Sequence, residues 1–382
     1  MLTSTGRGLV VVAVVAVLAG WALGWPELVG VGVAGAGALG LAAVALRRRP
    51  ELVVERTLQP SRVTAGDPAT GHLVVTNPEG RASATRSAHE RVGSGSVEVA
   101  VPRLAAGAST SIDYDLPTAR RGVLDVGPLV VRRGDPLGLA RADQELGGSA
   151  QLWVHPRRHV VPPLPSRLLR SLEGPEAETA PQGSITFHTI RDYVRGDDLR
   201  HVHWRTTART GTLMVRQLVD TSFPDVTVVL DDRPGPYPGD AFEPAVEIVA
   251  SIVVACTRER FPVHLRTPGG VALDSAGDPR AEVRALDVLT QLTPAPGPSL
   301  VAVLDRLGRD GQGSAAVLVT GSVDADQLAP LALLRRRFPV VVAVLVRPDA
   351  EGDAVPSVPG VTVLSVADST AFAARWRTKA AR

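Results

Sequence analysis

Residues 184–220 contain the densest set of side chains able to do chemistry. Asp197, Asp198, His201 and His203 fall within seven residues, and imidazole with carboxylate is a ligand set for zinc or iron. Two histidines at a spacing of two share a face on a strand but not on a helix. A metal-dependent hydrolase that uses these four groups is therefore one hypothesis for this stretch.

Arginines give the same stretch a second interpretation. It holds six arginines and four aspartates, and guanidinium groups pair with carboxylates through two parallel hydrogen bonds. Such a network around Trp204 would fix a turn and hold two modules together, and a contact surface for a partner protein is the third hypothesis. No nucleophile stands beside a base and no phosphate-binding glycine motif occurs, so the sequence favours a protein that is not an enzyme and has no cofactor.

The spacing of these residues resembles the signature of the DUF58 family, whose name marks a domain of unknown function. The pattern R-x-Y-x-x-G-D-D-x-R-x-x-x-W-x-x-x-A-R is matched by Arg191, Tyr193, Gly196, Asp197, Asp198, Arg200, Trp204, Ala208 and Arg209. An upstream run is also similar to the family's pattern, and it consists of Arg121-Gly122, Gly127-Pro128, Asp135-Pro136-Leu137-Gly138-Leu139 and Val154-His155-Pro156-Arg157.

The resemblance implies an architecture and a partner. DUF58 proteins are thought to contain or border a von Willebrand factor A-type domain, and they are similar to proteins that accompany MoxR-type AAA+ ATPases in assembling or maturing other proteins. An A-type domain often binds a divalent cation through D-x-S-x-S after its first strand. Here Asp231 is followed by Arg233 and Gly235 in place of the two hydroxyl residues, so we expect no cation at this position.

Length and composition limit the function classes. A chain of 382 residues with 45% hydrophobic residues is long enough for two or three domains. The net charge of +2 provides no general attraction for nucleic acid. The single cysteine, Cys256, excludes an internal disulfide.

Two apolar stretches at the N-terminus predict a membrane anchor. Gly8–Trp25 and Leu28–Leu46 are each close to the roughly 20 residues that cross a bilayer as a helix. Arg7 precedes the first stretch and Arg47–Arg49 follow the second, which places both termini in the cytoplasm, with the anchor in the plasma (inner) membrane. Small residues at a spacing of four predict the helix contact, at Gly32, Ala36 and Gly40.

The remaining chain divides into four further parts after the hairpin of residues 1–49. Short alternating runs over 50–160 predict an all-β, immunoglobulin-like sandwich. Within it, Asp135–Gly138 predicts a tight turn, with a contact loop as the alternative. Residues 161–183 are rich in proline and predict a linker, and 184–223 form the signature segment.

Residues 224–382 alternate between apolar strands and helices, which predicts a parallel sheet covered on both faces. This part resembles the von Willebrand factor A-like, Rossmann-type domain of the family. Ligands of open α/β sheets collect at the carboxyl ends of the strands. We therefore expect either a solvated strand end or a binding rim, and the rim would consist of Asp231, Asp232, Thr320 and Ser322.

The functional hypothesis that combines these features is a membrane-anchored interaction scaffold at the cytoplasmic face. Its partners would be the membrane and a protein, expected from the resemblance to be a MoxR-type AAA+ ATPase, and not nucleic acid. The alternatives are the metal-dependent hydrolase at 197–203 and a cation-dependent adhesion protein that acts through Asp231.

Overall fold

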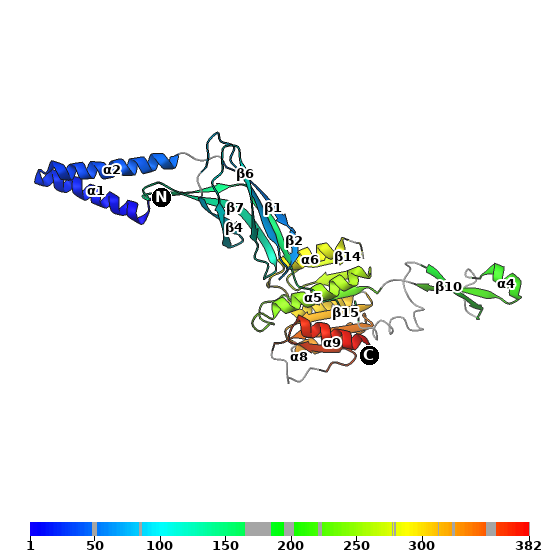
Figure 1. The fold of residues 1–382 in the computed structure, drawn as a ribbon. Coiled ribbons are helices and arrows are strands. Elements are labelled where there is room, and N and C mark those ends of the chain that lie inside the picture. Colours follow the sequence, from blue (N-terminus) through cyan, green and yellow to red (C-terminus); the bar gives the residue numbers. More distant parts are fainter. Residues whose placement is uncertain are drawn as a thin grey trace. The chain divides into compact units, whose positions relative to one another are not determined.

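Contacts divide the chain into two compact units, Met1–His155 and Pro156–Arg382 (Figure 1). The computed structural model describes residues 1–47, 52–83, 86–164, 185–194, 202–220, 224–276, 278, 280–311, 313–322, 325–348 and 357–381.

The first unit begins with two helices that form an antiparallel pair. α1 (Ser4–Leu23) is capped by the Thr3 hydroxyl, which accepts a hydrogen bond from the Gly6 amide, and it ends at Gly24 in the left-handed conformation. α2 (Pro26–Arg47) starts with proline, which has no amide hydrogen to leave unpaired in a first turn. Both helices are long and apolar enough to span a membrane.

The contact between α1 and α2 differs from the predicted one. A Cβ at Gly32 would lie 2.7 Å from the Ala13 carbonyl oxygen, and one at Gly35 would lie 3.1 Å from the Ala13 Cβ. Ala36 is exposed, and a Cβ at Gly40 would meet nothing within 4 Å. The predicted spacing of four is wrong because each step of four residues turns about 40° away from the contact face of a helix with 3.6 residues per turn.

Within the described residues, nine strands follow and form two sheets. The first sheet has the order β1–β3–β6 and is antiparallel. The second has the order β2–β9–β7–β4–β5, with β8 also paired to β7. The strands are β1 (Val53–Gln59), β2 (Arg62–Thr64), β3 (Thr70–Thr76), β4 (Arg86–Val92), β5 (Gly95–Val101), β6 (Ser109–Asp115), β7 (Gly122–Gly134), β8 (Arg141–Leu146) and β9 (Ala150–His155).

The two sheets share one apolar core, which confirms the predicted β-sandwich. Leu73 and Val75 on β3 belong to the same buried cluster as Leu129 on β7 and Leu152 on β9. Alternate residues point inward, as the burial pattern of β3 shows. This alternation is the property from which the short strands were predicted.

The signature segment forms a small two-stranded module in the second unit. β10 (Ile185–Asp192) pairs antiparallel with β11 (Met214–Asp220), and the short helix α4 (Trp204–Thr210) lies between them in the chain. The described residues of the module thus form two strands and one short helix.

The rest of the second unit contains a six-stranded sheet with the order β14–β13–β12–β15–β16–β17. All neighbours are parallel except the edge strand β14. The strands are β12 (Val226–Leu230), β13 (Val263–Arg266), β14 (Ala272–Ser275), β15 (Ala315–Thr320), β16 (Val340–Val346) and β17 (Thr362–Val366). The order reverses between β12 and β15, where ligands bind in many doubly wound sheets.

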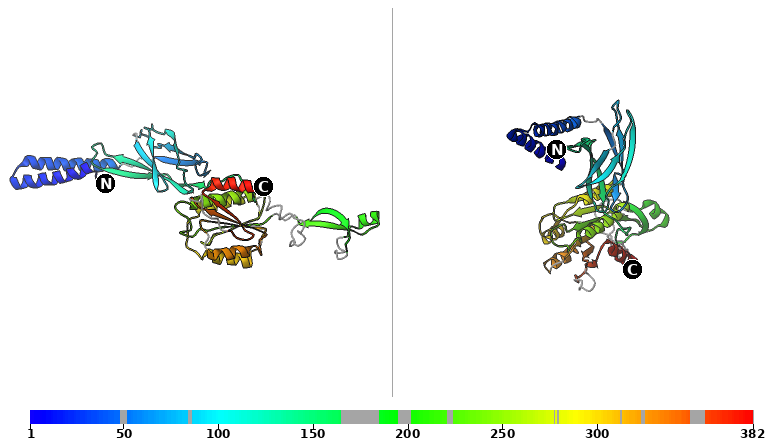
Figure 2. Two further views of the ribbon diagram at one scale, coloured as in Figure 1. Left: turned by 90° about the horizontal axis from the view of Figure 1, so that it is seen from below. Right: turned by 60° about the vertical axis from the view of Figure 1, so that its left-hand side comes forward.

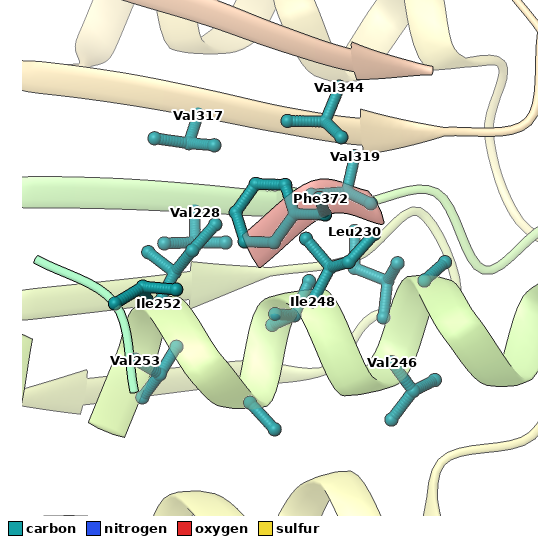
Figure 3. Packing of buried hydrophobic residues seen from close by; sticks show 14 of the residues in the cluster. Val228, Leu230, Val246, Ile248, Ile252, Val253, Val317, Val319, Val344 and Phe372 are labelled. Atoms are coloured by element: carbon teal, nitrogen blue, oxygen red, sulfur yellow. The ribbon is translucent and has the colours of Figure 1, made fainter. Parts of the chain in front are cut away.

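Helices cover both faces of this sheet (Figure 2). On one face, α5 (Phe242–Arg258), α6 (Ala281–Gln291) and α9 (Ser369–Ala381) pack against inward residues such as Val228 and Leu230. On the other, α7 (Leu300–Asp310) and α8 (Ala325–Leu334) pack against Val229. Figure 3 shows Ile248 and Ile252 of α5 with Val317 and Val319 in the larger core.

The predicted linker 161–183 is wrong at its start. Val161 and Leu164 are buried in the core of the second unit. The Trp376 indole of α9 donates a hydrogen bond to the Pro162 carbonyl at 2.9 Å. Residues 156–164, here called the strap, are therefore part of the α/β unit, and residues 165–183 lie outside the described residues.

Candidate functional site

The predicted rim residues lie where the sheet order reverses. Asp231 follows β12, and Thr320 ends β15, the neighbouring parallel strand. The Thr320 hydroxyl is 2.8 Å from Asp231 Oδ2 and 3.0 Å from the Ser322 carbonyl oxygen. The structure thus brings these three residues together, as expected for strand ends at one edge of a parallel sheet.

Arg233 neutralises the negative charge of Asp231 through an ion pair. Its Nε donates to Asp231 Oδ1 at 2.8 Å, and its Nη2 donates to Asp231 Oδ2 at 3.0 Å. Asp231 is fully buried and Thr320 is as well. Both oxygens of the Asp231 carboxylate accept hydrogen bonds from the Arg233 guanidinium, and one of them also accepts a hydrogen bond from Thr320. A cation could therefore bind Asp231 only after Arg233 had moved away.

Asp232 faces a different neighbour. Its Oδ1 accepts a hydrogen bond from the Gly269 amide at 2.7 Å. Its Oδ2 is buried without a hydrogen-bond partner among the described residues, and a Cβ on Gly269 would lie 2.5 Å from it. The expected solvated strand end is wrong, because Asp231 and Asp232 are 0% and 1% exposed. The edge is a closed polar network.

Tyr237 also contacts the end of β15. Its hydroxyl donates to the Val319 carbonyl at 3.3 Å. Burial, followed by the charges of Asp231 and Asp232, raises the pKa of Tyr237 far above its usual value. A Cβ on Gly321 would collide with the Pro236 carbonyl oxygen at 2.2 Å, so the 236–237 segment lies directly against the end of β15.

The structure places the signature residues unevenly. Arg191 lies on β10, Tyr193 is half-buried after this strand, and Arg209 is exposed on α4. Gly196, Asp197, Asp198 and Arg200 lie outside the described residues, as does His201. The predicted arginine–aspartate network is therefore not tested at its acidic members.

Trp204 is 68% exposed, and α4 has no buried residue. The indole is thus open to solvent, while the predicted arginine–carboxylate network around it stays a prediction, because its acidic members lie outside the described residues. A tryptophan in this position is available to a partner.

His203 caps α4. Its Nδ1 accepts a hydrogen bond from the Thr206 amide at 3.2 Å and lies 2.7 Å from the Thr206 hydroxyl. The His203 amide donates to the Met214 carbonyl at 2.8 Å, which ties the start of α4 to β11. The hydrolase hypothesis uses His203 as a metal ligand, but the capping bonds occupy its Nδ1. Within the described residues no group of three His, Cys, Asp or Glu side chains is arranged to hold a metal ion.

Two further apolar side chains of the signature module are exposed. Val194 is 62% exposed and Leu213 is 41% exposed. The amide of Tyr193, the neighbour of Val194, donates to the Leu213 carbonyl at 2.8 Å. We call Val194, Trp204 and Leu213 the signature face. Val194 follows β10, Trp204 begins α4 and Leu213 precedes β11, so all three belong to the part of the module between its two strands.

A polar group that sequence patterns did not indicate lies between the sheets of the sandwich. Arg56 on β1 forms an ion pair with Glu90 on β4, and the Tyr114 hydroxyl of β6 donates to the same Glu90 oxygen at 3.3 Å. Arg56 also donates to the Gly148 carbonyl. A Cβ on Gly127 would lie 2.5 Å from Arg56 Nη1, so the glycine of the Gly127-Pro128 motif leaves space for the guanidinium.

The second polar group that was missed joins the strap to two helices. The Ser369 hydroxyl at the start of α9 donates to the Glu247 carboxylate of α5, and His159 Nε2 lies 3.0 Å from the same hydroxyl. A nucleophilic serine donates its proton to the imidazole. Here the proton is directed to the carboxylate, so the group holds the strap in place and does not form a hydrolytic triad.

His264 on β13 lies between two carboxylates. Its Nε2 is 3.1 Å from Asp225 Oδ1, and its Nδ1 is 2.5 Å from Asp274 Oδ1, which Arg266 also contacts at 2.6 Å. The Asp225 carboxylate chiefly, and then Asp274, raises the pKa of His264 to about 9 although burial lowers it. The imidazole is therefore protonated at neutral pH.

We expect the free energy of unfolding of the second unit to fall as the pH rises from about 6.5 to about 9. The folded pKa of His264 lies above the unfolded value, so its contribution is fully present below pH 6.5 and is lost as the pH passes through the folded pKa. Because these groups are partly exposed, the loss should be about 1 kcal/mol. Urea titration with pulse labelling of the buried Cys256 measures it. A His264→Gln variant should lack this part of the pH dependence, and an unchanged slope in the variant would contradict the assignment.

Comparison with known proteins identifies the sequence family of the second unit. The family model described as "Protein of unknown function DUF58" matches residues 189–380, which is half of the chain. The match begins in β10 and extends through the six-stranded sheet to α9, so one family model covers both the signature module and the α/β sheet.

Individual relatives are distant. The chain is 26% identical over 153 residues to the uncharacterised protein YeaD of Bacillus subtilis, over 38% of this chain and 36% of YeaD. The CARDB domain of PF1109 from Pyrococcus furiosus, solved with di-metal ions, aligns with 28% of this chain and 93% of its own at 15% identity and a TM-score of 0.22. The Ro (RSR) protein of Deinococcus radiodurans aligns with 43% of this chain and 35% of its own at 12% identity and a TM-score of 0.31. These scores are too low to support inference.

Proposed function

The chain belongs to the DUF58 family, and we propose that it is a membrane-anchored interaction scaffold whose signature face binds a partner protein. In this proposal α1 and α2 cross the plasma (inner) membrane as a hairpin, with both termini in the cytoplasm. The arginines at the open ends of the two helices support this orientation. The sandwich and the α/β unit then lie at the cytoplasmic side.

The observation that carries the proposal is the exposure of Trp204 within the family's signature. Tryptophan is enriched at the centres of protein–protein interfaces, where its truncation commonly costs more than about 2 kcal/mol of binding free energy. Val194 and Leu213 of the same module are exposed as well, and so are Arg205 and Arg209 on α4. Exposed apolar and basic side chains in one module fit an acidic, apolar partner surface.

The α/β unit supports a binding role over catalysis. Its sheet has the strand order of a doubly wound α/β fold, and we propose that it is a von Willebrand factor A-like domain. We propose that the sandwich is immunoglobulin-like. At the strand ends, Arg233 takes the position next to Asp231 that a cation would take in an adhesion domain. A domain that is neutralised in this way would bind proteins without a metal, which favours the scaffold over cation-dependent adhesion.

From the family resemblance we propose a MoxR-type AAA+ ATPase as the partner. Its assembly or maturation activity would be brought to the membrane by the hairpin and to the client by this chain. The hydrolase alternative depends on Asp197, Asp198 and His201, which lie outside the described residues, and no described contact favours it.

A photo-crosslinking amino acid at position 204 should capture an AAA+ ATPase in cells that contain the full-length protein. Trp204→Ala should weaken binding of the purified partner by at least about thirtyfold, which corresponds to 2 kcal/mol. The matched control is Val283 on α6, which is 43% exposed and lies outside the signature face. Equal capture of the ATPase from positions 204 and 283, or unchanged affinity of Trp204→Ala, would contradict the proposal.

A further inference from the structure

The turn between β7 and β8 is bound to the start of the helical hairpin. The Thr3 amide donates to the Leu139 carbonyl at 3.0 Å, and the Thr3 hydroxyl donates to the Gly138 carbonyl at 2.7 Å. A Cβ on Gly6 would lie 1.9 Å from the Leu139 carbonyl oxygen. The first turn of α1 therefore lies in direct backbone contact with residues 138–139, an approach that glycine at position 6 permits.

The turn itself is rigid. Asp135 is buried, and its two carboxylate oxygens accept hydrogen bonds from the amides of Leu137 and Ala140. Burial raises the pKa of Asp135, but the amides of Ala140 and Leu137 lower it by more, so the pKa is below its usual value. The turn and the contact loop that the sequence left as alternatives are thus the same feature, and its contact is with α1 and α2.

The contact also includes apolar side chains well inside the helices. Leu139 and Ala140 share a buried cluster with Ala42 of α2, against which Leu9, Ala38, Leu39 and Leu46 pack. Ala38 is nine residues before Arg47, which is about 13 Å along a helix, and Leu9 is about 7 Å beyond Ser4. In a helix that spans a hydrocarbon layer of about 30 Å, these positions lie at or inside the boundary with the headgroups.

Leu137 lies two residues before the buried Leu139, in the turn that contacts the helix ends, and its side chain is 54% exposed. Leu2, which pairs with Ala140 across an isolated bridge, is 42% exposed. Exposing these two apolar side chains to water is unfavourable. Moving them from water to the acyl boundary of a bilayer would lower the free energy by about 25 cal/mol for each Å² of apolar surface transferred. Arg7 and Arg47 are exposed near the same helix ends, and long basic side chains near the ends of membrane-spanning helices extend to the membrane interface.

We propose that the β7–β8 turn enters the membrane interface and that Leu137 contacts lipid. The sandwich would then meet the bilayer through a fixed turn as well as through the chain after α2. This inference rests on the proposed membrane anchoring by α1 and α2, and the experiment separates the two.

The test uses spin labels on single cysteines in the full-length protein, reconstituted in phosphatidylglycerol–phosphatidylethanolamine nanodiscs. Cys256→Ala provides the background. The labelled variants are Leu137→Cys, Val15→Cys in the middle of α1, and Ser94→Cys in the β4–β5 turn. Val92, two residues before Ser94, is opposite Val126 on β7, eight residues from Gly134, so Ser94 lies roughly 27 Å or more from the lipid-facing turn along the strand.

We expect relaxation by oxygen to exceed relaxation by an aqueous nickel chelate at positions 137 and 15, and the order to be reversed at 94. If position 15 is lipid-exposed and 137 behaves like 94, the interfacial turn is overturned while the anchor stands. If position 15 is itself aqueous, the anchor and the inference both fail. Protection of position 137 from both reagents would indicate a protein contact, such as a second copy of this chain, and would also overturn lipid contact.

Discussion

Glu90→Ala is expected to lower the free energy of unfolding of the first unit by about 3–5 kcal/mol, because removing one member of a buried ion pair leaves the other charge uncompensated. The Arg56 and Glu90 side chains are 4% and 0% exposed. One atom of each, Arg56 Nη2 and Glu90 Oε2, already has no hydrogen-bond partner among the described residues. Loss of Glu90 would leave the guanidinium with the Gly148 carbonyl as its described acceptor.

The double variant Arg56→Met, Glu90→Leu separates the ion pair from simple packing. Replacing both charges by apolar side chains of similar volume is commonly neutral or stabilising in a protein core. We therefore expect the double variant to unfold at a higher urea concentration than Glu90→Ala. A double variant as unstable as the single one would show that the pair itself stabilises the sandwich.

The unfolding of the first unit can be followed by thiol labelling in the Cys256→Ala background. Val101 on β5 is fully buried, and Val101→Cys conserves most of its volume, so its labelling by a pulse of reagent reports opening of the core. Glu145→Ala is the matched control. Glu145 pairs with Arg91 at 2.7 Å, but both side chains are more than half exposed, and such a pair is worth about 0.5 kcal/mol. Equal effects of Glu90→Ala and Glu145→Ala would contradict the buried-pair interpretation.

The α/β sheet could be predicted because its signals are local. Val340–Val346 is apolar at every position, Val226–Leu230 is apolar except at Thr227, and both strands are buried at every position, as strands between two helical layers must be. α7 was missed although Ser299 caps it and its apolar residues recur at helical spacing over Leu300–Asp310. Charged residues interrupt its apolar residues, so the helix becomes evident only when the apolar positions are compared with the 3.6-residue period of a helix.

The polar clusters could not be predicted because their members are distant in sequence. Glu90 is 34 residues from Arg56 and belongs to the other sheet, so the pairing depends on how the two sheets meet. Both residues lie in alternating strands, where a charged residue is expected to face solvent. The spacing in Asp135–Leu139 showed the turn, but its contact with Gly6 depends on the position of α1.

The signature segment shows the limit of a motif. Its spacing identified the family. Burial is not part of a spacing pattern, so the motif alone does not tell whether Trp204 is exposed. In α4 no second layer covers the helix among the described residues, and the indole remains exposed.

Trp376→Ala is expected to lower the free energy of unfolding of the second unit by about 3–5 kcal/mol, the range for truncating a large buried aromatic residue. Trp376 is fully buried, lies 5.0 Å from Phe372 between ring centres, and donates its indole proton to the Pro162 carbonyl. Truncation would leave a cavity beneath the strap and an unpaired carbonyl. Trp376→Phe would keep most of the apolar volume and cost about 2 kcal/mol, of which the hydrogen bond accounts for about 1 kcal/mol.

Cys256, the single cysteine of the chain, reports this change without further substitution. It is fully buried in the same core, and its thiol lies 3.7 Å from the Pro163 carbonyl oxygen. Global unfolding and local release of the strap are distinguished by urea, because opening of a small surface responds weakly to denaturant. Trp204→Ala is the matched control, since it removes the same side chain from an exposed site and should leave the labelling of Cys256 unchanged. If both tryptophan variants shift the urea midpoint equally, Trp376 does not anchor the strap to α9.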